Sequence, residues 1–113
     1  MNPRPAAGLL VSAVIRRVAA AGGNAAILAR GDATSGAILF LCLEKGQNPR
    51  FFERGLGPDG ASGLRPTGPD TLADDADATD YWRRRRSRDP DLWVVELDIA
   101  GAERFAAETM TFG

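Results

Sequence analysis

With 113 residues, of which 44% are hydrophobic and 26% charged, the chain has the size and composition of a single globular domain. The net charge of −1 gives the whole molecule no electrostatic attraction to nucleic acid or to acidic membranes. The sequence holds no histidine and one cysteine, which excludes Ser-His-Asp and Cys-His catalysis, histidine-ligated metals and an internal disulfide. We therefore expect a non-enzymatic domain with no cofactor and no metal.

The first predicted element is a helix from Leu9 to Ala21, preceded by residues 1–8, which we expect to be frayed. Its apolar positions form one helical stripe: Leu10, Val11, Val14, Ile15 and Val18. Ser12 is a candidate N-cap, and Gly22-Gly23 predicts the end of the helix. We find no signal peptide and no apolar run of about 18 residues, so we expect a cytoplasmic bacterial protein that does not span a membrane.

The next region predicts a three-stranded meander. The apolar runs Ala25–Arg30 and Ala37–Glu44 flank the polar loop 31–36, and together they predict a β-hairpin. A second turn at Gly46–Pro49 is followed by a weaker strand at Arg50–Arg54.

The segment from Ala37 to Leu43 is apolar on both faces, so we expect it to be covered on both sides of the sheet. Cys42 lies within this segment and is expected to be a buried, unreactive thiol. The second sheet face then needs a cover. That cover is the C-terminal segment with Phe105, Met110 and Phe112, a second subunit in a homodimer, or a protein partner.

The glycine- and proline-rich stretch Gly55–Pro69 predicts a mobile surface loop. A helix is predicted over Thr71–Ser87, with an acidic start and a basic end that match the helix dipole. Leu92–Ile99 is the clearest predicted strand, with Trp93 and Val95 facing the core, and a short helical tail is expected around Ala102–Glu108.

These elements predict a single α+β domain over residues 1–113, in the order α-β-β-β-α-β. We expect a four-stranded, mainly antiparallel sheet with the two helices packed on one face. The last strand is expected to return beside the first hairpin by a right-handed crossover.

The arginine run at the end of the second helix is the main candidate for a binding site. Its candidate residues, with the turn that follows, are Arg83, Arg84, Arg86, Arg88, Asp89 and Asp91. An aromatic residue at Tyr81 or Trp82 is available to stack on a base, so the run can serve as an anion or RNA contact. The alternative is a solvated helix end in which Asp80 pairs with neighbouring arginines and Trp82 anchors the helix to the sheet.

The acidic residues after this helix are a second candidate cluster: Asp89, Asp91, Glu96 and Asp98. Ion pairs with the arginine-rich helix end explain them more simply than a catalytic dyad, which also needs an enclosing pocket.

Three stretches resemble one family, namely Leu10–Arg17, Arg30–Leu39 and Asp89–Glu96, whose DPDLWVVE sequence is the most specific. In order and spacing they are similar to short alphaproteobacterial-type proteins of domain-of-unknown-function family 1491. The resemblance implies no activity, cofactor or catalytic residue. Two hypotheses follow from the residues: a protein-binding or self-associating module, and an anion- or RNA-binding module that uses the arginine helix.

Overall fold

The computed structural model describes residues 6–56, 62–69, 72 and 74–110. Along the chain its elements are α1 (Ala7–Ala20), β1 (Asn24–Ala29), β2 (Ile38–Glu44), β3 (Gln47–Leu56), β4 (Ser62–Thr67), α2 (Asp75–Arg88), β5 (Trp93–Asp98) and α3 (Ala102–Met110). The α+β class is confirmed. Within the described residues, however, the sheet has five strands in the order β1-β5-β2-β3-β4, and it is mixed because β2 and β5 run parallel.

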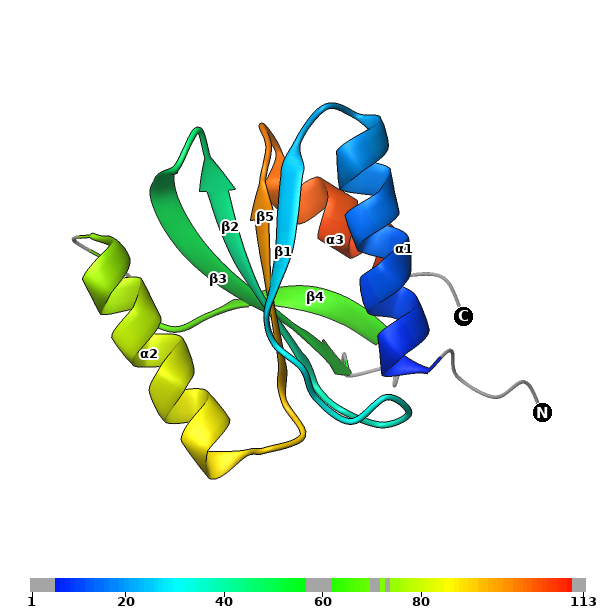
Figure 1. Ribbon diagram of the computed structural model, residues 1–113, viewed down its shortest axis with the longest axis vertical. Helices are drawn as coiled ribbons and strands as arrows, with labels where there is room; N and C mark the ends of the chain where they lie inside the picture. The colour runs from blue at the N-terminus through cyan, green and yellow to red at the C-terminus, as the bar shows by residue number, and fades with distance from the viewer. Residues whose placement is uncertain (1–5, 57–61, 70–71, 73, 111–113) are drawn as a thin grey trace.

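The predicted hairpin between the first two strands is wrong, because β5 lies between them (Figure 1). Ala25 of β1 pairs with Leu97 of β5 in antiparallel register, and Leu39 of β2 pairs with Val94 of β5 in parallel register. Four residues of β5 are buried: Trp93, Val94, Val95 and Leu97. A strand that is buried on both faces belongs in the middle of a sheet, and this requirement outweighs the local tendency of neighbouring strands to pair.

The prediction of a mobile loop over Gly55–Pro69 is wrong for residues 62–67, which form β4 and pair with β3. Glu53 lies opposite Arg65 in this antiparallel pair. Pro66 is compatible with β4 because an edge strand needs hydrogen bonds on one side only. Residues 57–61 lie outside the described residues.

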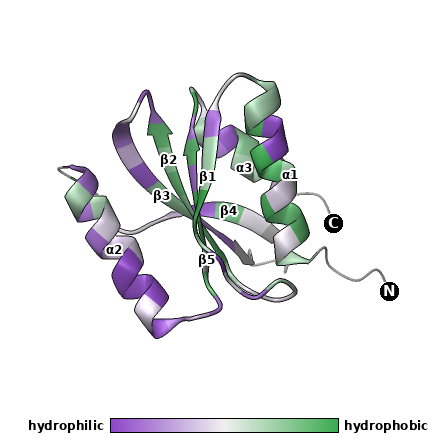
Figure 2. Ribbon diagram, in the orientation of Figure 1, coloured by the Kyte–Doolittle hydropathy of each residue, from purple (hydrophilic) through white to green (hydrophobic). Residues whose placement is uncertain are grey.

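The two long helices lie on opposite faces of the sheet, so the prediction that they share one face is wrong (Figure 1). On one face, α1 and α3 cover residues that include Phe40, Trp93 and Val95. On the other face, α2 covers Leu41 and Val94. In Figure 2 the ribbons of the central strands are mostly green (hydrophobic), and the ribbon of α2 is largely purple (hydrophilic) towards its C-terminal end. Because α2 of the same chain covers the second face, neither a second subunit nor a protein partner is needed to explain the burial of β2 on that face.

The start of α1 differs from the prediction. Ser12 is not the N-cap, because it lies within α1 with its side chain exposed. Ala6 is the N-cap residue and makes no side-chain capping hydrogen bond. Instead, the amides of Ala7 and Gly8 donate to the carbonyls of Thr34 (3.2 Å) and Ala33 (2.9 Å). These bonds satisfy first-turn donors that a helix cannot pair internally. Residues 7 and 8 are therefore held in place rather than frayed, while residues 1–5 lie outside the described residues.

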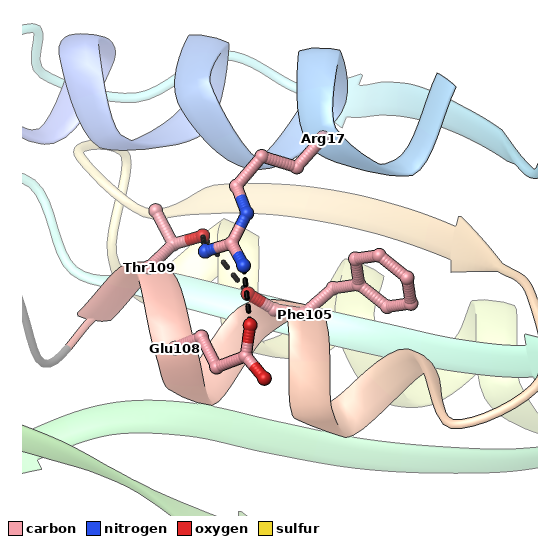
Figure 3. A network of polar contacts seen from close by, with 4 residues as sticks. All are labelled: Arg17, Phe105, Glu108 and Thr109. Carbon is pink, nitrogen blue, oxygen red and sulfur yellow. Dashed lines mark hydrogen bonds and ion pairs between the residues drawn. The ribbon is translucent and has the colours of Figure 1, made fainter. Parts of the chain in front are cut away.

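The apolar stripe of α1 is confirmed, because Leu10, Val11, Val14 and Val18 are buried and Ile15 is partly buried. Arg17, beside the stripe, fastens the tail helix α3 to α1 (Figure 3). Its guanidinium forms an ion pair with Glu108 and donates to the Thr109 hydroxyl at 3.2 Å. Among the described residues, no helix is long and apolar enough to cross a bilayer.

Cys42 is expected to be unreactive in the native protein. Its side chain is fully buried on β2, and burial raises the pKa of the thiol to about 12. At pH 8 almost no reactive thiolate is present, so a thiol reagent should label the native protein slowly and the urea-unfolded protein quickly. Fast stoichiometric labelling without denaturant would contradict the burial of this strand.

Candidate functional site

The charge distribution of α2 follows the predicted polarity. The Asp74 carboxylate caps the helix by accepting from the Asp77 amide at 2.9 Å, and Asp75 and Asp77 lie in the first turn. The last turn is basic. Opposite charges at the two ends complement the helix dipole. Of the hollows formed by described residues, two border α2, and we call them the acidic groove and the arginine hollow.

The acidic groove lies between α2, the β2–β3 turn and strands β1, β2 and β5, and has a volume of about 430 Å³. Its apolar lining comes from Leu28, Leu41, Leu43 and Trp82. Its charged lining comes from Asp75, Arg83, Glu96 and Asp98. The groove therefore combines an aliphatic floor with three carboxylates and one guanidinium.

Glu96 is one of the three carboxylates that line this groove. Partial burial raises the pKa of its carboxyl group above the ordinary value, and the nearby charges of Asp98 and Asp75 raise it further. In the part of the chain that the structure describes, no arginine or lysine makes an ion pair with Glu96. Asp98, by contrast, accepts a hydrogen bond from the Gly46 amide at 2.9 Å and so closes the β2–β3 turn. No group of three acidic or cysteine side chains among the described residues is arranged to hold a metal ion.

The arginine hollow lies on another side of α2, has a volume of about 290 Å³, and is lined by Tyr81, Arg84, Arg85 and Arg88. Arg85 is half-buried and donates to the Tyr81 hydroxyl at 3.1 Å and to the Glu53 carboxylate at 3.0 Å. The Tyr81 ring in turn packs on Phe51, with 4.7 Å between ring centroids. Arg84 and Arg88 are exposed at the rim.

The candidate arginines of the sequence do not form one surface. Arg83 lines the acidic groove, with its guanidinium 5.6 Å from the centre of the Trp82 ring. Arg86 donates to the Arg30 carbonyl at 3.0 Å. The structure brings together only Arg84 and Arg88, and it adds Arg85 and Tyr81.

Sequence reasoning did not include Arg85 among the candidate binding residues and considered Tyr81 only as an aromatic that could stack on a base, although a signal for this site was present. Residues 81, 84, 85 and 88 have the spacing i, i+3, i+4 and i+7, which places them on one helix face.

Two other expectations concern the same helix. Trp82 packs against the core under α2, as the anchor interpretation predicted. Asp80 forms no ion pair with Arg83 or Arg84 within the described residues.

Asp89 and Asp91 lie in the turn between α2 and β5. The Asp89 carboxylate accepts from the Asp91 amide at 3.1 Å. The Asp91 carbonyl accepts from the Asp32 amide at 3.0 Å. Asp32 itself organises the 31–36 loop, because its carboxylate accepts from the amides of Thr34 and Ser35. These hydrogen bonds also lower the pKa of Asp32.

Two of the three stretches that carry the family resemblance, Arg30–Leu39 and Asp89–Glu96, meet at this loop, and the first turn of α1 joins them there. The Trp93 indole donates to the Asp32 carbonyl at 2.8 Å, and the first turn of α1 donates to Ala33 and Thr34. The loop, the turn before β5 and the start of α1 therefore form one structural unit.

The family model described as "Protein of unknown function (DUF1491)" matches residues 6–107, which includes all three stretches. The chain belongs to the DUF1491 family. The predicted resemblance is thereby confirmed. No match is found among curated proteins.

Solved structures of relatives agree with the fold of this DUF1491 protein. A crystal structure of a DUF1491 family protein from Caulobacter crescentus CB15 is 29% identical, has a TM-score of 0.77, and covers 88% of this chain and 92% of that chain. An NMR structure of a DUF1491 family protein from the same organism is 29% identical with a TM-score of 0.73, and covers 88% and 89%. The solution structure of protein Atu0922 from A. tumefaciens is 28% identical with a TM-score of 0.65, and covers 84% and 86%.

Proposed function

We propose that this DUF1491 protein is a small, non-enzymatic module that binds another protein through the acidic groove. The supporting observation is the meeting of an aliphatic floor (Leu28, Leu41, Leu43) with three carboxylates beside the exposed acidic half of α2. Protein interfaces commonly combine apolar contacts with a charged rim. The groove offers contacts of both kinds along one side of a helix.

The charges of the groove define the partner's chemistry. Three carboxylates outnumber the single guanidinium of Arg83, and within the described residues no arginine or lysine forms an ion pair with Glu96. The carboxylates are not arranged to ligate one metal ion, so separate cationic groups suit them better. The ligand that fits is a protein segment with arginine or lysine beside an aliphatic residue. If that segment comes from a second copy of this chain, the module is self-associating.

Photo-crosslinking in native cells tests this proposal. We would place benzoylphenylalanine at Thr79, which lines the groove, and at exposed Ser12 on α1 as the matched control. We expect a specific adduct from position 79 that is absent from position 12. An adduct at twice the mass of the chain would identify self-association. Identical adducts from both positions, or none from position 79, would refute binding through the groove.

Replacing Glu96 with glutamine should raise the melting temperature at pH 7 and weaken the Thr79 adduct. A carboxyl group whose pKa is higher in the folded state binds its proton more tightly there, so its contribution to stability falls as pH rises through that range. Glutamine removes this penalty, and the gain should disappear well below the ordinary glutamate pKa of 4.5, where the carboxyl group is protonated in both the folded and the unfolded protein.

The exposed residue Glu44 at the end of β2 provides the matched control, because Glu44→Gln should change neither the melting temperature nor the adduct. Stability gained at the expense of binding is typical of a residue kept for function. A lower melting temperature for Glu96→Gln would show instead that this carboxylate holds the fold together.

A further inference from the structure

Independently of the acidic groove, we propose that the arginine hollow binds a phosphate group on a small anionic ligand. Arg84, Arg85 and Arg88 line this hollow together with the Tyr81 hydroxyl. Each guanidinium presents several N–H donors in a planar fork that matches the oxygens of a phosphate. Arg84 and Arg88 are exposed and lie one helical turn apart, on the same helix face as Arg85, whose side chain is held by hydrogen bonds. Together the three guanidinium groups can enclose a compact oxyanion.

The charge balance of the hollow favours an anion. The hollow's lining contains no carboxylate among the described residues, and Glu53 forms its described ion pair with Arg85 at 3.0 Å. Within the described residues, Arg84 and Arg88 form no ion pair with any carboxylate. Arg65 lies directly opposite Glu53 on β4 and therefore on the same sheet face, which adds positive charge nearby. These cations offset the unfavourable dipole at the C-terminal end of α2.

The inner wall of the hollow is already ordered without ligand. Arg85 is held by Tyr81 and Glu53, and Tyr81 is held by Phe51. A charge that is fixed before binding loses little conformational entropy when the ligand arrives. The exposed side chains of Arg84 and Arg88 then supply the further hydrogen bonds to the phosphate.

A single phosphate fits this hollow better than a nucleic acid strand does. Strand binding without sequence preference relies on aromatic side chains that stack on bases along a basic track. Here the Tyr81 ring is packed on Phe51, and Trp82 packs against the core on the acidic-groove side. The exposed Asp80 beside the arginines and the net charge of −1 also oppose a polyanion.

The test is an NMR titration of the full chain with inorganic phosphate, with AMP as a phosphate monoester, and with single-stranded RNA. The titrations would compare wild type, the double variant Arg84→Gln/Arg88→Gln, and the matched control Arg16→Gln/Arg104→Gln. The control arginines are exposed on the opposite face, in α1 and α3. Because Arg84 and Arg88 are exposed, the double variant should fold normally, and its unperturbed amide spectrum would verify this.

We expect saturable shifts at residues 81–88 with phosphate, AMP or both, and affinity that falls as salt rises. The double variant should bind at least about tenfold more weakly, because two charge-assisted contacts are lost, while the control changes less than about twofold. Binding of AMP alone would assign the site to phosphate monoesters, and binding of both to the phosphate group as such. Non-saturating shifts, equal loss in the control variant, or tight binding of RNA alone would overturn the proposal.

Discussion

The replacement of Trp93 by alanine is expected to lower the free energy of unfolding by about 3–5 kcal/mol. Trp93 is only 4% exposed and lies in the core beneath α1, where it helps to join the start of β5 to the 31–36 loop. Alanine would leave a large cavity and would also leave the Asp32 carbonyl without its indole donor. Such a loss is a large share of the stability of a domain of this size.

Urea unfolding of Trp93→Ala beside Trp82→Ala provides a matched comparison of the two tryptophans. Trp82 is only half-buried where it packs against the core under α2. Trp82→Ala should therefore lower the free energy of unfolding by less than about 2 kcal/mol. Similar midpoints for the two variants would show that Trp93 is not the central packing residue of its face.

The replacement of Gly31 by alanine should cost about 3 kcal/mol or more, because the new methyl group has no room. A Cβ at Gly31 would lie 2.1 Å from the Asp91 carbonyl oxygen and 2.7 Å from the Trp93 amide nitrogen. Both are backbone atoms, which cannot move without displacing the start of β5. Gly36 faces the same carbonyl, at 2.3 Å. The two glycines of the loop are therefore explained by the close approach of a second chain segment.

Gly63 in β4 is the control for this substitution, because a Cβ there meets no atom within 4 Å. Gly63→Ala should change the free energy of unfolding by less than about 0.5 kcal/mol relative to wild type. The Gly31 and Trp93 substitutions disturb the same contact, so their double variant should lose less stability than the sum of the single variants. Additive losses, or a neutral Gly31→Ala, would refute the close packing of this loop.

Local patterns in the sequence determined most of the elements. The stripe of α1, the charge polarity of α2 and the strand Trp93–Asp98 all arise from residues near each other in the chain, and the predictions placed each within a few residues of its observed bounds. The apolar character of β2 on both faces correctly required cover on both sides. The strand β4 escaped prediction because glycine and proline, which signal loops, are tolerated at a sheet edge.

Only the tertiary structure decided how these elements combine. The alternation along a strand shows which residues share a face but does not identify the neighbouring strand, so the insertion of β5 between β1 and β2 could not be derived locally. α3 packs with α1 on one face of the sheet, and α2 packs on the other face. The packing of Ala78 and Trp82 on the sheet then set the rotation of α2. That rotation directs Arg83 to the acidic groove and Arg84, Arg85 and Arg88 to the arginine hollow, because consecutive helical residues point about 100° apart.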